Sequence, residues 1–259
     1  EKTSRKKILI CDPKTGSACV EKIVSTLARR AYRRPVTPAE VRGLMRFVTD
    51  AQRNGKGVEY GIRTSLVAML VSPQFLFRSE RDPDPTDPTK VHRVSDFELA
   101  SRLSYFLWRS MPDDELLAAA ESGKLREPVA FRAQVKRMLD DPKSVALADD
   151  FAGQWLELRN LDTMKPDPDR FLYWGPELRA AMKTETRMFF DYILRNNRPI
   201  SEFLNARYTF LNERLARHYG VPNVSGPEYR RVTWPGPERA GLLAQGSMPG
   251  RLRLRAHAR

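Results

Sequence analysis

The sequence lacks several features that would define a function directly. It has three histidines, His92, His218 and His257, and two cysteines, Cys11 and Cys19. The histidines do not have the spacing of a zinc or haem site, and there is no C-x-x-C-H motif for covalent haem attachment. The G-x-S-x-G serine elbow and the glycine-rich phosphate loops are also absent. We therefore expect no cofactor and no metal in this segment.

Long apolar runs are missing as well. No stretch approaches the roughly 20 consecutive apolar residues that a membrane-spanning helix needs, so we predict no transmembrane segment. The chain begins at Glu1 rather than at a methionine. We interpret it as a fragment of a larger protein, and draw no conclusion about its compartment from the missing signal segment.

The charge of the chain is strongly basic but unevenly distributed. The formal net charge is +13. Residues 1–90 hold 18 basic and 10 acidic residues, residues 91–245 hold 23 and 22, and the last 14 residues hold four arginines and no acid. The excess therefore lies at the two ends and not in one continuous stripe, and we do not expect nucleic-acid binding.

Helical periodicity dominates the first 80 residues. Apolar side chains at helical spacing predict three helices, over about 18–33, 38–53 and 59–71. Thr37 and Glu40 form a capping box for the second of these helices, with a proline at its first position. Residues 1–80 are therefore predicted to be a small three-helix domain that carries the cysteine pair at its N-terminal end.

A proline- and aspartate-rich segment, residues 81–94, is predicted to be a linker, because its prolines cannot continue a helix. A larger helical domain follows over 95–235. It opens with a second capping box, Ser95 to Glu98, and its longest helix is expected over 177–195. Only residues 229–233 resemble a strand. The fold class is predicted to be mainly α, with a small three-helix unit and a larger helical bundle.

Four arginines crowd one side of the first helix, namely Arg29, Arg30, Arg33 and Arg34. Like charges this close repel each other, so something usually offsets them. They are candidates for a surface that docks an acidic partner or a neighbouring domain of the same chain. Ion pairing with acidic residues of the larger domain and plain solvation are the two alternatives.

Chemistry-bearing residues are few in the larger domain. Glu185 lies on the long aromatic helix, where burial could raise its pKa and fit it for proton chemistry. The alternative is an ion pair with a nearby arginine that orders the bundle. His218 near Glu213 is best explained as a histidine at a helix end. Trp155, at helical spacing from other apolar residues, is expected in the core rather than in a ligand pocket.

Longer segments of the chain carry a family resemblance. They are LARRAYRRPV at 27–36, VSPQFLFR at 71–78, LASRLSYFLW at 99–108, MPDDEL at 111–116, FAGQWL at 151–156, ET and FF at 185–190, and YTFLNERL at 208–215. In this order they resemble domains of unknown function that are abundant in planctomycetes. Those domains occur in large exported proteins that often carry a c-type cytochrome domain upstream.

The resemblance implies an exported, multidomain protein of the periplasm or cell envelope, with haem in an upstream domain if anywhere. It also bears on the cysteines. Their C-x7-C spacing leaves both reduced thiols and a disulfide open, but members of the family have a cysteine pair just before the first motif. The resemblance therefore favours a disulfide between Cys11 and Cys19.

The end of the chain departs from the family. Residues 238–245, ERAGLLAQ, resemble the opening of a further domain, whereas SMPGRLRLR at 247–255 does not continue it. We interpret residues 236–259 as the start of a further domain followed by an aberrant basic tail.

No reaction follows from any of these observations. The first hypothesis is a structural or interaction module of a large exported protein, with neighbouring domains or an acidic envelope partner as its contacts. The alternative is part of a hydrolase-like envelope enzyme whose active site is completed by missing segments. A cavity with converging polar groups near Glu185 or His218 would favour the enzyme.

Overall fold

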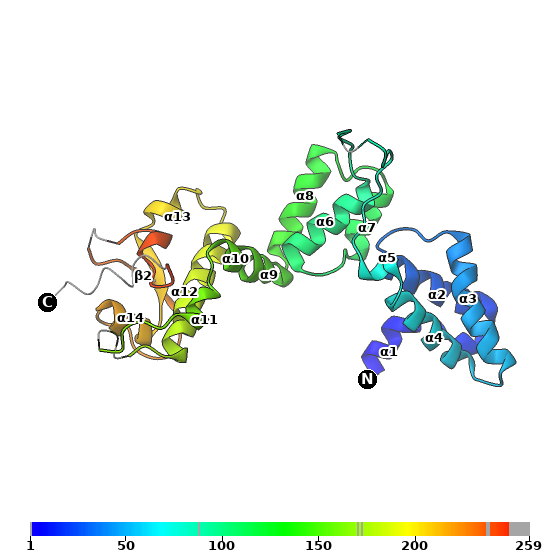
Figure 1. Ribbon diagram of the computed structural model, residues 1–259, viewed down its shortest axis with the longest axis horizontal. Coiled ribbons are helices and arrows are strands. Elements are labelled where there is room, and N and C mark those ends of the chain that lie inside the picture. The colour runs from blue at the N-terminus through cyan, green and yellow to red at the C-terminus, as the bar shows by residue number, and fades with distance from the viewer. Residues whose placement is uncertain (1, 88, 170, 172, 237–238, 249–259) are drawn as a thin grey trace. The chain divides into compact units, whose positions relative to one another are not determined.

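The described residues of the chain form helices joined by loops, with one short pair of strands. The computed structural model describes residues 2–248 except 88, 170, 172, 237 and 238 (Figure 1). It divides into two compact units between Lys136 and Arg137. Helices dominate the described part of each unit, and the predicted mainly α class is confirmed.

The first unit is built from short and medium-length helices. They are α1 (Lys2–Ile8), a 3-10 turn (Pro13–Thr15), α2 (Ser17–Tyr32), α3 (Pro38–Arg53), α4 (Val58–Leu70), α5 (Pro73–Leu76), α6 (Asp96–Trp108) and α7 (Asp114–Glu121). Helix α8 (Pro128–Asp140) continues the chain into the second unit.

Side-chain caps fix where two of these helices begin. The hydroxyl of Thr37 accepts from the backbone N–H of Glu40 at 3.2 Å, and the Glu40 carboxylate accepts from the N–H of Thr37 at 2.8 Å. Ser95 and Glu98 make the same reciprocal pair at the start of α6. Each box satisfies N–H groups that the first turn of a helix leaves unbonded, and both predicted capping boxes are confirmed.

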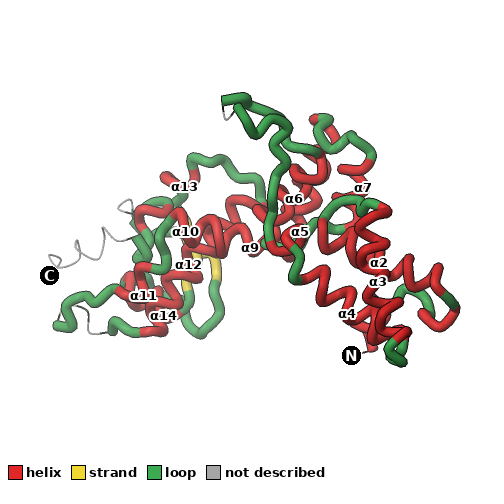
Figure 2. Tube along the Cα trace, turned by 45° about the vertical axis from the view of Figure 1, so that its right-hand side comes forward, coloured by secondary structure: helices red, strands yellow, loops and turns green. Residues whose placement is uncertain are grey.

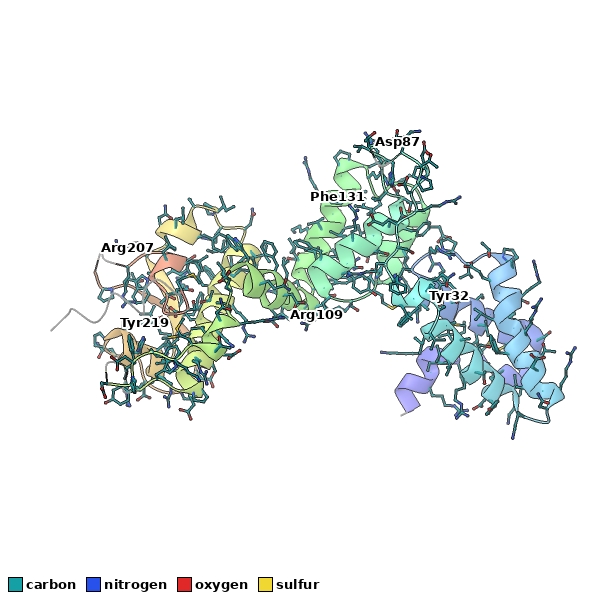
Figure 3. The ribbon with its side chains drawn as sticks, in the orientation of Figure 1. Tyr32, Asp87, Arg109, Phe131, Arg207 and Tyr219 are labelled. Carbon is teal, nitrogen blue, oxygen red and sulfur yellow. A yellow bond between two sulfur atoms is a disulfide. The ribbon has the colours of Figure 1, made fainter. Side chains whose placement is uncertain are left out.

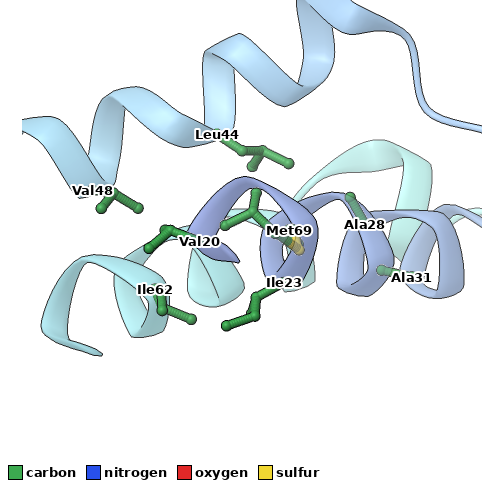
Figure 4. Close-up of a cluster of buried hydrophobic side chains, with 9 residues drawn as sticks. Val20, Ile23, Ala28, Ala31, Leu44, Val48, Ile62 and Met69 are labelled. Atoms are coloured by element: carbon green, nitrogen blue, oxygen red, sulfur yellow. The ribbon is translucent and has the colours of Figure 1, made fainter. Parts of the chain in front are cut away.

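The core of the first unit lies between α2, α3 and α4 (Figure 4). Its buried side chains are Val20, Ile23, Val24, Ala28, Ala31, Leu44, Val48, Ile62 and Met69. Helices α3 and α4 approach so closely at Gly61 that a Cβ atom there would lie 2.6 Å from the Cα of Val48. Only glycine fits this contact without a shift of one helix.

The second unit combines broken helical segments with one long helix. Its elements are a 3-10 turn (Pro142–Ser144), α9 (Val145–Leu147), a π-helical turn (Ala148–Ala152), α10 (Gly153–Trp155), α11 (Asn160–Thr163), α12 (Pro176–Arg195), α13 (Glu202–Asn205), β1 (Tyr208–Leu211), α14 (Glu213–Tyr219), β2 (Arg230–Thr233) and a 3-10 turn (Leu242–Ala244).

Helix α12 is the centre of the second unit. It contributes buried side chains to two apolar clusters, one with Leu211 and Leu215 and one with Phe210 and Leu242. Strands β1 and β2, yellow in Figure 2, pair antiparallel. Tyr208 lies opposite Thr233 in this pair. The sequence predicted β2 but not β1, since Tyr208–Leu211 does not alternate apolar and polar residues and three of its four side chains are buried.

The predicted core position of Trp155 is wrong. Its side chain is 56% exposed and stacks on the 44% exposed Phe151, with ring centroids 5.9 Å apart. The π-helical turn inserts an extra residue before α10, which rotates the following side chains relative to a regular helix. As a result the small residues Ala148 and Ala152 face the core in place of the aromatic pair.

The predicted linker, residues 81–94, contains no helix or strand among its described residues. It lies within the first compact unit, and its own polar contacts include an ion pair of Lys90 with Asp84 at 2.9 Å. The proposed division into domains at this linker stays a prediction.

Of the C-terminal segment predicted over 236–259, the structure describes residue 236 and residues 239–248, and the basic run after Met248 lies outside the described residues.

Over the part of the chain that the structure describes, no helix is both long enough and apolar enough to cross a membrane.

We expect Trp155→Ala to destabilise the protein by about 1–2 kcal/mol, since the exposed ring loses mainly its contacts with the rings of Phe151 and Phe203. Phe189→Ala is the matched comparison, because Phe189 is completely buried on α12. That truncation should cost roughly 3–5 kcal/mol. Urea denaturation of both variants measures the difference, and equal costs would contradict the exposed position of Trp155.

Limited proteolysis tests the predicted linker. We expect trypsin to cut first after Arg81 or Lys90, because proline-rich exposed segments open more readily than packed helices. Mass spectrometry of the early fragments identifies the sites. Early cutting inside α12 with residues 81–92 intact would argue against a linker at this position.

Candidate functional site

A buried polar cluster lies at the centre of the second unit, around Glu185. The carboxylate of Glu185 accepts hydrogen bonds from the hydroxyl of Thr209 at 2.6 Å and from that of Tyr219 at 2.6 Å. Glu185 and Thr209 have no solvent exposure, and Tyr219 (labelled in Figure 3) is 6% exposed. Three elements, α12, β1 and α14, therefore converge on one carboxyl group.

Local structure explains why these side chains point inward. Glu185 follows the buried Met182 by three residues and precedes the buried Phe189 by four, so it shares the inner face of α12. Tyr219 is the last residue of α14, which ends at Gly220 in the left-handed conformation, with φ of 70°. This ending, common at helix C-termini, turns the chain away directly after the tyrosine.

The cluster also holds the C-terminal end of the described chain. The backbone N–H of Gly246 donates to the hydroxyl of Tyr219 at 2.6 Å. A Cβ atom at Gly246 would lie 2.9 Å from that hydroxyl and 2.8 Å from the end of the Met182 side chain, so a larger residue there would displace one of these side chains. The tyrosine thereby links Glu185 to a segment 61 residues further along the chain.

A second set of hydrogen bonds fastens the same segment to α12. The hydroxyl of Thr186 donates to the side-chain oxygen of Gln245 at 2.7 Å and lies 2.6 Å from the hydroxyl of Ser247. All three side chains are buried. Ser247 is the first residue of the run that the sequence interpretation set aside as aberrant, yet it belongs to the buried cluster.

Burial raises the pKa of Glu185 to about 7, because the ionised carboxylate is removed from water. The hydroxyls of Thr209 and Tyr219 and the positive charge of Arg239 act in the opposite direction. Burial also raises the pKa of Tyr219 well above its usual value, so this hydroxyl stays protonated. Since the hydroxyl of Thr209 can accept as well as donate, the site accommodates either protonation state of Glu185.

The sequence alternatives for Glu185 can now be compared with its surroundings. Among the described residues its hydrogen bonds come from two hydroxyls, and not from an arginine as the ion-pair alternative required. Arg239 acts from outside, with its guanidinium over the rings of Tyr219 at 4.6 Å and Trp234 at 5.2 Å. The cluster can hold and exchange one proton, but a carboxyl without exposure has no direct access to a substrate.

His218 and Glu213, the second candidate pair from the sequence, do not form a comparable buried cluster. Glu213 pairs with Arg217 and accepts from the backbone N–H of Gly226 at 2.7 Å. His218 lies in the last turn of α14, with its ring 5.3 Å from the ring of Tyr219. In the described segments no three His, Cys, Asp or Glu side chains are grouped to hold a metal ion, and His257 lies outside them.

The four candidate surface arginines have separate environments. Arg29 pairs with Glu121 at 2.8 Å and Arg30 with Asp114 at 2.7 Å, both on α7. The sequence left three alternatives for the four arginines: docking of a partner, ion pairing with acids of the larger predicted domain, and solvation. Arg29 and Arg30 have the environment of the second alternative.

The other two arginines lie at the end of α2. Arg34 pairs with Glu40 at 2.7 Å. Arg33 is only 5% exposed, and its guanidinium donates to backbone carbonyls of Ala31, Gln74, Phe75 and Phe77 at 2.7–3.3 Å. Helical spacing alone placed Arg33 on the surface, but α2 ends at Tyr32 and Arg33 turns inward in the left-handed conformation, with φ of 58°.

A cleft of about 1160 Å³ opens beside Arg33 and Arg34 in the first unit. Its charged lining residues are Arg33, Arg34, Arg78, Glu80, Arg81, Arg93, Glu98 and Arg102. The sequence analysis missed this cleft. Half of its arginines follow α5 or lie in the predicted linker, and no local periodicity indicates that these segments face α6.

Cys11 and Cys19 are joined by a disulfide, with their Cα atoms 6.1 Å apart. Both cysteines pack against the apolar core between α2, α3 and α4. The bond closes the short loop that precedes α2, and it fixes the entry of the chain into the first unit.

Glu185 predicts an unusual pH dependence of stability. Its pKa is about 7 in the folded protein and near 4.5 when unfolded, so the folded state binds more protons between these values. The contribution of Glu185 to stability should therefore be largest below about pH 4.5, and roughly 3 kcal/mol of it should be lost as the pH rises through 7. Glu185→Gln should remove this decrease.

The measurement is urea denaturation followed by tryptophan fluorescence between pH 5 and 8. Glu228→Gln is the matched control, because Glu228 is exposed and its replacement should leave the decrease intact. If Glu185→Gln retained the full slope of the unsubstituted protein, the carboxyl would not titrate in this range.

Two family models match separate parts of the chain. Residues 19–80 match the family described as PSD5, protein of unknown function (DUF1595), and residues 94–221 match PSD4, protein of unknown function (DUF1592). Residues 81–93 lie between the two matches. No curated protein and no solved structure matches the chain. The chain therefore contains a DUF1595 domain followed by a DUF1592 domain, two families without an assigned function.

Proposed function

We propose that the chain is a structural and interaction module that orients neighbouring domains of a larger exported protein. The observation that carries this proposal is a set of polar contacts between the DUF1595 domain and the first helices of the DUF1592 domain. We call it the polar clasp, and define it by the pairs Arg29–Glu121, Arg30–Asp114 and Glu80–Arg102.

The magnitude of these contacts indicates what the clasp can do. The side chains of Arg30 and Asp114 are 37% and 63% exposed, and those of Glu80 and Arg102 are 33% and 59% exposed. Exposed pairs of this kind contribute only about 0.2–1 kcal/mol each. These ion pairs act mainly on orientation, because several charge pairs together favour one orientation of two surfaces over others.

Further contacts support the same role for the clasp. The backbone N–H of Arg81 donates to the carboxylate of Glu98 at 2.8 Å. The guanidinium groups of Arg33 and Arg78 lie over the ring of Tyr105 on α6, at 5.9 and 4.6 Å from its centroid. Both ends of the DUF1595 domain, α2 and the segment after α5, thus contact the start of the DUF1592 domain.

The proposal includes an exported location in the periplasm or cell envelope. The Cys11–Cys19 disulfide supports it, because such bonds persist in oxidising compartments. The resemblance of the sequence to cytochrome-associated proteins suggests that one of the oriented neighbours is a c-type cytochrome domain upstream. We assign the buried Glu185 a structural role in this scheme rather than a catalytic one.

Charge reversal tests the clasp. We expect Arg29→Asp with Arg30→Asp to broaden the distance distribution between spin labels at positions 52 and 132, because each new aspartate faces an acid of α7. Adding Asp114→Arg and Glu121→Arg should restore the opposite charges and narrow the distribution again. Double electron–electron resonance measures both changes.

Arg42→Asp with Arg46→Asp is the control, since both arginines are exposed on α3 away from the clasp. It should leave the distribution as narrow as in the unsubstituted protein. A distribution that stays narrow when the clasp arginines are reversed would refute the orienting role.

A further inference from the structure

The arginine-lined cleft of the first unit carries more positive charge than its own residues offset. Six guanidinium groups and two carboxylates line it. Its walls come from the end of α2, from the segment that follows α5, and from the N-terminal part of α6. Tyr32, labelled in Figure 3, stands at the α2 side of the opening.

Some of this charge is already engaged. Arg34 pairs with Glu40, and Arg102 pairs with Glu80. Arg33 is buried and donates to four carbonyls. These groups shape the cleft, but their hydrogen-bonding capacity is largely used within the protein.

Two other arginines differ in this respect. The side chains of Arg81 and Arg93 are exposed and have no ion-pair partner among the described residues. Arg78 is also exposed, and lies over the ring of Tyr105. A guanidinium presents a planar set of donors that matches a carboxylate in a bidentate pair. The cleft therefore has free donors for an anionic ligand.

We infer that this cleft binds an acidic peptide segment of a partner protein. The volume of about 1160 Å³ exceeds what a single small anion fills and accommodates a segment of several residues. The lining also includes the aromatic rings of Tyr32, Phe77 and Phe97, of which Phe77 is 64% exposed. An apolar side chain between two acidic residues can cover Phe77 while its neighbours reach the arginines.

The two carboxylates in the lining favour an acidic peptide over a ligand with closely spaced phosphate or sulfate groups. Glu80 and Glu98 stand among the arginines and would repel closely spaced phosphate or sulfate groups. A peptide carries its carboxylates on flexible side chains separated by backbone N–H donors. Glu80 pairs with Arg102, and Glu98 accepts from the N–H groups of Arg81 and Ser95, so peptide N–H groups would use the remaining lone pairs of these carboxylates.

The inference rests on the proposed function, since the clasp joins the two domains that line the cleft. Its test uses the whole chain and a short fluorescein-labelled peptide of Glu-Glu-Phe repeats, followed by fluorescence anisotropy. Arg81→Ala with Arg93→Ala should weaken binding by at least about tenfold. Added salt should weaken binding to the unsubstituted protein. Arg42→Ala with Arg46→Ala removes the same charge from α3 and should bind as the unsubstituted protein does.

Three results would overturn the inference. They are equal binding of a Gln-Gln-Phe peptide, undiminished binding by the Arg81 and Arg93 variant, and tighter binding of inorganic polyphosphate or a sulfated oligosaccharide through the same arginines. Spin-label distances measured on the same samples separate the two proposals. A narrow distribution without peptide binding refutes the cleft alone, whereas a broad distribution in the unsubstituted protein refutes the clasp.

Discussion

A charged group that leaves water must find partners within the protein, and each unit is organised around one such group. In the first unit it is the guanidinium of Arg33, which gathers the carbonyls of Gln74, Phe75 and Phe77. These carbonyls belong to the segment where the chain leaves the DUF1595 domain. The position of that segment determines where Arg78 and Arg81 stand, and with them one wall of the cleft.

In the second unit the buried polar group is the carboxyl of Glu185. Glu185 is surrounded by apolar side chains of α12 and neighbouring elements, and hydroxyls from β1 and α14 supply its hydrogen bonds. Removal of a single partner would leave a buried polar group unsatisfied, which costs more than a typical hydrogen bond contributes. The Gly246 contact extends this network, so the fixed position of residues 245–247 depends on Tyr219.

Features that depend on neighbouring residues could be predicted from the sequence. The capping boxes at Thr37 and Ser95, the long helix over 177–195 and the buried stripe of α2 all follow from spacing within one element. The sequence misplaced Arg33 and Trp155 because Arg33 lies at an interruption of regular helix and Trp155 follows one. A left-handed residue ends α2 at Arg33, and a π-helical turn precedes Trp155. Helical periodicity does not apply across such an interruption.

The candidate sites required contacts that no local pattern contains. Glu185 was recognised as unusual from its place on an aromatic helix, but its partners lie 24, 34 and more residues away, on elements that the sequence does not bring together.

The charge distribution of the sequence points more directly to function. Residues 1–90 have a net charge of +8 and supply four of the six arginines that line the cleft, whereas residues 91–245 are nearly neutral. Charge that is not needed for folding and is concentrated on one domain favours recognition of an acidic partner there. In the second unit, by contrast, both oxygens of the buried Glu185 carboxyl have hydrogen-bond partners within the unit, so this group is not available to a partner protein.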